Sequence, residues 1–211
     1  MPDPSHTEKA AQLEKDAKAA AASDAHTKAG DAYHAAAREH TDSGNDSERK
    51  GDHADAQKAF EKAAADHDEA ATEYLKANAN DKAIREYQKA ATASMQAAEA
   101  AQADGDDSAA AKLYGAAARF HETAAILCDS IGQVERAEKQ YEIAAEYRIS
   151  AAEAYLAAGD TDGAMTAYMG AAFAYEEIVK INRKQNEFDE AERYTKKAGK
   201  AEAKAKALDK P

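Results

Sequence analysis

Histidine, aspartate and glutamate stand out chemically in this chain, because they are common ligands of divalent transition metals. Six of the 7 histidines precede residue 68: His6, His26, His34, His40, His53 and His67. His26 and His34 are eight residues apart, and His67 stands between Asp66 and Asp68. Neither HExxH nor Glu-x-x-His occurs, the spacings with which zinc proteases and di-iron bundles direct several ligands inward. We therefore predict no metal site and no cofactor.

Candidate catalytic groups are also scarce. The single cysteine, Cys128, lies 27 residues before Tyr155, one period of the repeat that runs through this chain, so we expect it to be a small buried apolar group. Residues 159–163 read GDTDG, but an EF-hand register would put Ala158 first and Met169 twelfth, where carboxylates are required. No GxxxxGK[ST], GxGxxG, CxxC or GxSxG motif occurs. We predict that the protein is not an enzyme.

Composition and charge restrict the fold class and the partners. The 211 residues are rich in Ala, with only 10 Gly and 3 Pro, and no stretch alternates apolar and polar residues as a half-buried strand would. The net charge of -12 disfavours nucleic acid and anionic membranes, which are bound through clustered Lys and Arg. Neither a signal peptide nor a run of about 18 apolar residues is found. We expect an all-α, cytoplasmic protein without nucleic-acid binding or membrane insertion.

An internal repeat sets the positions of the helices. Aromatic residues recur every 27 residues at Phe60, Tyr87, Tyr114, Tyr141 and Tyr168. Nine residues before each aromatic stands a residue that tolerates the left-handed conformation at a helix end: Gly51, Asn78, Gly105, Gly132 or Gly159. Between turns, apolar residues follow helical spacings of three and four, as in residues 135–158. Each repeat is therefore one long helix plus a tight turn, and about seven such helices should form an antiparallel up-down array, either an open solenoid or a closed bundle.

The repeat resembles the tetratricopeptide repeat over residues 51–200. The residues that carry the resemblance are Tyr155, the Gly159-Asp160 pair, Ala164, Tyr168 and Ala171. The tetratricopeptide period is usually about 34 residues, so the shorter period here suggests that two short helices are fused into one. Such a zigzag of long helices is loosely similar to the soluble NSF-attachment proteins, which are membrane-trafficking adaptors.

Residue types vary along the chain and suggest its domain organisation. Large apolar residues are scarce before residue 80 and accumulate from Ile84 to Ile181. The polar segment from Thr41 to Asp52 is expected to be a loop or hinge. We predict a polar, Ala-rich helical arm and hinge over residues 1–50, partly flexible, a repeat domain over 51–200 and a charged tail over 201–211.

Two functions from different classes fit the sequence. The first is a non-enzymatic scaffold or adaptor that binds a protein, or copies of itself, along a face of the array. The resemblance maps the tetratricopeptide groove onto Arg119, Glu122, Asp129, Glu146, Glu153, Glu176, Lys180 and Arg183. The acidic character of this face favours a basic or amphipathic helical peptide. The alternative is a hydrophilic stress protein of the late-embryogenesis-abundant kind, which the first third and the tail resemble in composition.

Overall fold

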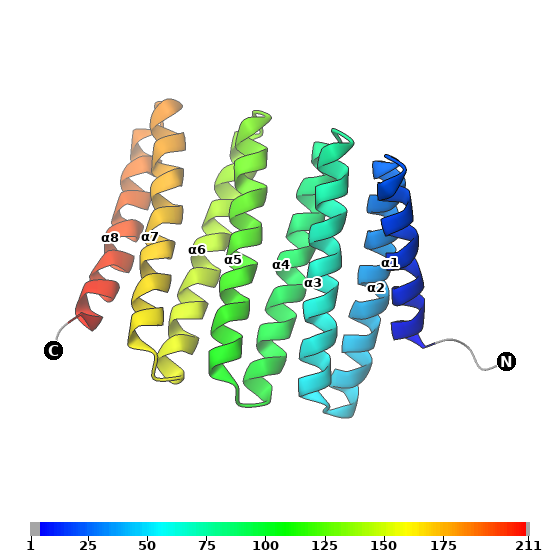
Figure 1. Cartoon of the computed structure of the whole chain (residues 1–211). Coiled ribbons are helices and arrows are strands. Elements are labelled where there is room, and N and C mark those ends of the chain that lie inside the picture. Colours follow the sequence, from blue (N-terminus) through cyan, green and yellow to red (C-terminus); the bar gives the residue numbers. More distant parts are fainter. Residues whose placement is uncertain (1–4, 210–211) are drawn as a thin grey trace. The chain divides into compact units, whose positions relative to one another are not determined.

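The structure is a computed structural model that describes residues 5–209 as eight α-helices joined by tight turns (Figure 1). The helices are α1 (His6–Ala22), α2 (His26–Lys50), α3 (His53–Lys76), α4 (Asn80–Ala103), α5 (Asp107–Ser130), α6 (Val134–Ala157), α7 (Thr161–Lys184) and α8 (Phe188–Leu208). From α3 to α8, each helix begins 27 residues after the one before it. The predicted all-α repeat is confirmed, with eight helices where about seven were expected.

The chain divides after Gly105 into two compact units, which we call unit 1 (α1 to α4) and unit 2 (α5 to α8). Within each unit, every helix packs mainly against its neighbours in sequence. In unit 2, α5 and α7 form one layer and α6 and α8 the other, and unit 1 alternates in the same way (Figure 1). None of the helices within residues 5–209 is both long and apolar enough to cross a membrane.

The predicted turns follow from residues that adopt positive φ. Gly51, at φ 77°, ends α2, and the amides of Gly51 and Asp52 donate to the carbonyls of Glu48 and Ser47. This pattern satisfies carbonyl groups that the helix end would otherwise leave unpaired. The remaining turns within unit 1 and unit 2 each contain a residue with positive φ as well: Asp24, Asn78, Gly132, Gly159 and Asn186.

Thr41 to Asp52 is not the expected loop, because α2 continues through Lys50. This polar segment contains one position, Gly44, that packs against another helix. A Cβ at Gly44 would lie 2.6 Å from Cε1 of Phe60, so the glycine lets the fully buried Phe60 ring of α3 reach the α2 backbone. The contact explains why a residue with poor helix propensity is accommodated in the middle of a helix.

The contacts between helices divide the chain after Gly105, and not at the ends of the expected arm and repeat domain. Both α1 and α2 belong to unit 1, where α2 packs against α3 as extensively as α3 packs against α4. At the other end, α8 extends to Leu208 and buries Ala201 and Ala205. Alanine faces supply little area each but let helices approach closely, so sparse large apolar residues do not prevent packing. Residues 1–4, 210 and 211 lie outside the described part.

Candidate functional site

The structure places the predicted partner-binding residues on three helices of unit 2. Arg119, Glu122 and Asp129 lie on α5, Glu146 and Glu153 on α6, and Glu176, Lys180 and Arg183 on α7. Seven of the eight are exposed, and Glu122 is half-buried. Glu122 forms a bidentate ion pair with Arg148 of α6, whose Nε and Nη2 donate over 3.0 and 2.9 Å to its two carboxylate oxygens. Glu122 therefore connects two helices.

Arg148 also shows which side of α6 faces the other layer. Arg148 pairs with Glu122 of α5. Its Cδ also lies 3.0 Å from the position that a Cβ on Gly170 of α7 would occupy. Glu146 is two residues earlier, about 200° around the helix, and Glu153 shares its exposed side. The eight residues therefore do not form one surface. Those on α5 and α7 belong to one layer, while Glu146 and Glu153 point away from it.

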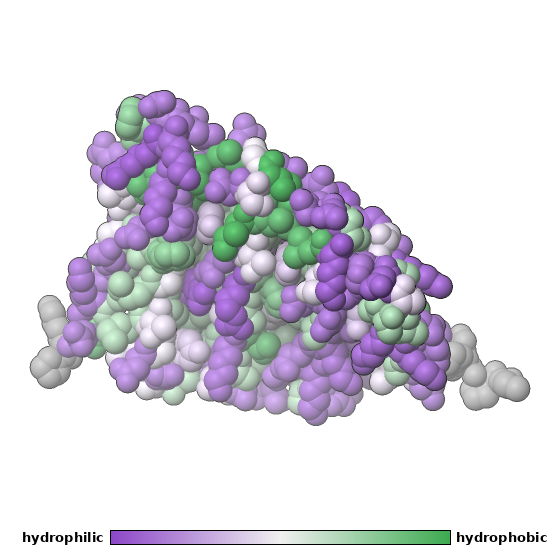
Figure 2. Space-filling model, turned by 45° about the horizontal axis from the view of Figure 1, so that its top comes forward, coloured by the Kyte–Doolittle hydropathy of each residue, from purple (hydrophilic) through white to green (hydrophobic). Residues whose placement is uncertain are grey.

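The outward side of α5 and α7 carries exposed apolar residues that sequence reasoning had counted toward the core or left aside. Five residues of α7 follow one another at alternating spacings of four and three, which places them on one stripe of the helix. They are Met169, Phe173, Glu176, Lys180 and Arg183. The exposed fractions are 47% for Met169, 53% for Phe173 and 60% for Ile126, which lies seven residues after Arg119 on α5. Figure 2 shows that exposed hydrophobic side chains gather in patches between hydrophilic ones. We call Ile126, Met169 and Phe173, with the charged residues around them, the α5/α7 face.

Charged residues frame the apolar side chains of this face. The ammonium of Lys180 lies 5.6 Å from the centroid of the Phe173 ring and pairs with Glu177 at 2.6 Å. Glu176, Lys180 and Arg183 also line a groove of about 430 Å³ between α7 and α8. Three of the predicted residues thus share one stripe of α7, and the packing of α8 beside it completes a groove next to the Phe173 ring.

Unit 2 also contains a buried histidine. His121 stacks on Tyr147 with ring centroids 5.6 Å apart, and its Nδ1 lies 2.8 Å from Oε1 of Gln140. Because the amide oxygen only accepts, Nδ1 carries the proton of this contact. Burial lowers the pKa of His121, and the hydrogen bond to Gln140 opposes that shift.

We expect His121 to make the stability of unit 2 depend on pH. The imidazole of His121 has a pKa of 6.5 in the unfolded chain and a lower pKa in the folded chain, so below pH 6.5 the unfolded chain binds the proton more readily. The free energy of unfolding should therefore fall as the pH drops below 6.5. Urea unfolding of wild type and His121→Gln above and below that pH measures the effect. A difference between the two proteins that stays constant with pH would contradict the assignment.

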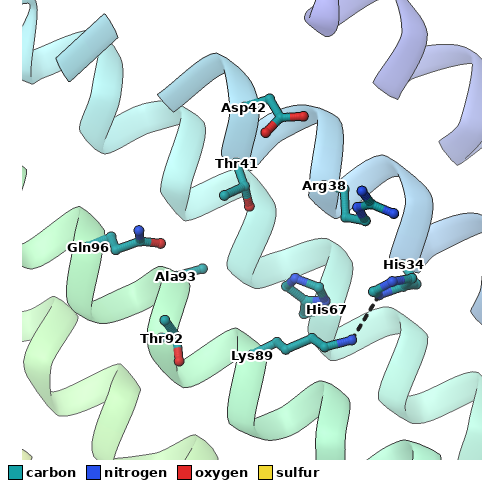
Figure 3. A pocket seen from close by; sticks show the side chains of 9 residues that line it. All are labelled: His34, Arg38, Thr41, Asp42, His67, Lys89, Thr92, Ala93 and Gln96. Carbon is teal, nitrogen blue, oxygen red and sulfur yellow. Dashed lines mark hydrogen bonds between the residues drawn. The ribbon is translucent and has the colours of Figure 1, made fainter. Parts of the chain in front are cut away.

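Unit 1 has an open pocket between α2 and α4 and above α3 (Figure 3). The cavity has a volume of about 470 Å³. Its lining consists of His34, Arg38, Thr41, Asp42, His67, Lys89, Thr92, Ala93 and Gln96. Four of these side chains are basic, Asp42 is acidic, and three others offer hydroxyl or amide groups, so the lining mixes charges of both signs with neutral polar groups.

Glu86 joins the helices beneath this cavity. Its Oε2 lies 2.7 Å from Nδ1 of His67 and 3.0 Å from Nδ1 of His34, and its Oε1 accepts from Lys89 at 2.8 Å. Lys89 also lies 3.3 Å from Nδ1 of His34 (Figure 3). Burial alone would raise the pKa of Glu86, but the hydrogen bonds from the two histidines and Lys89 outweigh it and hold that pKa well below its usual range. Glu86 is therefore a compensated buried anion.

A second histidine cluster joins α1, α2 and α3. Nε2 of His40 lies 3.2 Å from Oε1 of Glu14 and 3.6 Å from Oδ2 of Asp66. The sequence search considered only spacings within one helix, whereas both clusters take their members from three helices. One signal was available in the repeat: His40 and His67 are 27 residues apart, and His121 follows 54 residues later. These histidines therefore occupy equivalent inward positions of the repeat, and Ser94 takes this position in the repeat between His67 and His121.

Comparisons with known proteins identify the fold class. No protein-family model matches the chain, and no curated protein matches it either. Among solved structures, the chain is similar to the de novo designed helical repeat protein DHR64, with a TM-score of 0.61, 22% identity, and coverage of 96% of this chain and 94% of that one. The DHF58 filament matches at TM-score 0.62 and 22% identity over 96% and 95% of the two chains, and the DHF119 filament at 0.63 and 23% over 98% and 99%. At these identities the likeness establishes the fold alone, which is that of a helical repeat protein.

Proposed function

We propose that this chain is a non-enzymatic helical-repeat scaffold whose α5/α7 face binds an amphipathic helix of a partner protein. The supporting observation is the exposure of Ile126, Met169 and Phe173 among charged residues on one layer of unit 2. Large apolar side chains exposed together on a polar surface are typical of binding sites. Acidic groups beside them and the net charge of -12 favour a partner helix with basic residues around its apolar stripe.

The scaffold proposal includes two narrower statements. Kinship with tetratricopeptide proteins is supported by the turn and aromatic positions of the repeat, with a period shortened to 27 residues. Self-association through the same face is the homotypic form of the function, in which a second copy supplies the apolar side chains. Sedimentation of wild-type protein over a range of concentrations separates binding of a second copy from binding of another partner.

Replacing Ile126 and Phe173 together by serine should weaken binding of a basic amphipathic helix by about tenfold or more, since a buried apolar anchor contributes upward of about 1 kcal/mol. The probe is a labelled Lys-rich peptide with leucines at helical spacings, and fluorescence anisotropy measures its affinity. The matched control is Leu156→Ser, which removes an apolar side chain with 40% exposure from α6, outside the α5/α7 face.

Three outcomes count against this proposal. The first is equal affinity of the double variant and wild type. The second is equal affinity for a peptide of the same composition whose helix is broken by proline. The third is a gradual, non-cooperative loss of the far-ultraviolet circular dichroism signal on heating, which would favour the stress protein instead, because a packed repeat array unfolds cooperatively whereas a disordered chain does not.

A further inference from the structure

Glu14, His40 and Asp66 bring three ligand-type side chains together from α1, α2 and α3. Their ligand atoms all lie within 4.8 Å of one another. His40 and Asp66 are buried, whereas the side chain of Glu14 keeps 31% of its surface exposed. The cluster is therefore closed by α2 and α3 and reached from solvent beside Glu14.

The clearest sign of an electrostatic imbalance is Asp66. Its Oδ2 is fully buried and accepts no hydrogen bond from the described residues. Its contact with Nε2 of His40, at 3.6 Å, is too long for a hydrogen bond. Burial and, to a lesser extent, the neighbouring Glu14 carboxylate raise the pKa of Asp66 to about 7. Two carboxylates thus face each other with one imidazole between them, an arrangement that a bound cation would compensate.

The distances suit ligands that share an ion. Nε2 of His40 is 3.2 Å from Glu14 and 3.6 Å from Asp66. Zn²⁺ holds nitrogen and oxygen ligands at about 2.0–2.2 Å, which in a tetrahedron places them about 3.3–3.6 Å apart. The imidazole nitrogen disfavours Mg²⁺ and Ca²⁺, which prefer oxygen ligands. We propose that Glu14, His40 and Asp66 form a binding site for a divalent transition-metal ion, with Zn²⁺ as the favoured ion and solvent as the fourth ligand.

The other histidine cluster provides a comparison within the same unit. His34 and His67 approach Glu86 at 3.0 and 2.7 Å, which are hydrogen-bond distances. The Lys89 ammonium, 2.8 Å from Glu86, already supplies a positive charge there and would repel a metal ion. The negative charge of Glu86 is therefore compensated by Lys89 without a metal. Among the described residues, the carboxylate of Asp66 has no such compensation.

Other charged side chains also act on the proposed site. Lys18 lies 3.9 Å from Glu14 on the same helix, and its side chain is 69% exposed, so it can turn into solvent at little cost. Lys62 also lowers the pKa of Asp66, while Glu69 raises it. An ion held by three helices would attach α1 to the rest of unit 1, and because it binds the folded chain it would raise thermal stability.

Zinc titration of the full chain tests the site. After treatment with a chelator, calorimetry near neutral pH should show one Zn²⁺ bound per chain, and Zn²⁺ but not Mg²⁺ should raise the melting temperature. Asp66→Asn and His40→Gln should each weaken zinc binding by more than about 100-fold, since even groups that only support a ligand contribute 10–100-fold. His34→Gln is the matched control, because it removes a histidine from the compensated cluster, and it should bind zinc as wild type does.

A second measurement keeps the test independent of folding. Asp66→Asn removes a buried charge without changing shape and should fold, which circular dichroism verifies, and Co²⁺ should give the visible absorption of a tetrahedral site with wild type and not with this variant. The proposal is overturned if wild type binds zinc no more tightly than Asp66→Asn, or if His34→Gln abolishes binding. Neither result affects the α5/α7 face, which lies in unit 2.

Discussion

Replacing Phe60 by alanine should destabilise unit 1 by about 3–5 kcal/mol, the usual cost of removing a fully buried aromatic side chain. Phe60 is completely buried, and it is the largest such side chain in the described chain. Its ring fills the position beside Gly44, so alanine would leave a cavity between α2 and α3 that two long helices cannot close by a local shift. Urea unfolding followed by circular dichroism measures the loss.

The matched control is Phe173→Ala, which removes the same ring from a site with 53% exposure. Surface replacements usually change stability by less than about 0.5 kcal/mol. Similar losses for the two variants would contradict the packing assigned to α2 and α3. Because Phe173 belongs to the α5/α7 face, this control also checks that a binding defect caused by changing it does not come from unfolding.

Replacing Glu86 by alanine should also destabilise unit 1, by about 1–3 kcal/mol, because the buried His67 would be left without its hydrogen-bond acceptor. His67 would lose its acceptor at 2.7 Å, and Lys89 and His34 would face each other without the carboxylate between them. Glu86→Gln keeps the shape and part of the hydrogen bonding and should cost less. Urea unfolding near neutral pH gives both values.

Two comparisons distinguish this effect from a general loss of charge. Glu190→Ala removes an exposed partner of Arg193 and should change stability by less than about 0.5 kcal/mol. Because the folded pKa of Glu86 is lowered from 4.5, its contribution is present above pH 4.5 and is lost as pH falls below it. The difference between wild type and Glu86→Gln should therefore shrink in acid, and a constant difference would count against an ionised Glu86.

The sequence predicted the repeat well because its signals are local. Left-handed turns favour Gly or Asn at a helix end, and Gly51, Asn78 and Gly159 occupy such positions. Cys128 is buried, as its repeat position indicated. The prediction failed where a local signal pointed the wrong way: Gly44 and its polar neighbours indicate a loop, and only the Phe60 ring on another helix explains why they continue α2.

Sites were less predictable, because they depend on how each helix is rotated about its axis and on the layer to which it belongs. The tetratricopeptide-like mapping treated Glu146 and Glu176 as one face, yet their helices expose opposite sides of unit 2. The sequence by itself thus determined the all-α class, the 27-residue alternation of helix and turn, and the up-down order of the helices, because turn chemistry and apolar period act within one repeat. Tertiary structure alone decided which side chains converge, as with Glu14, His40 and Asp66, because their proximity comes from the packing of three helices and not from any spacing along one.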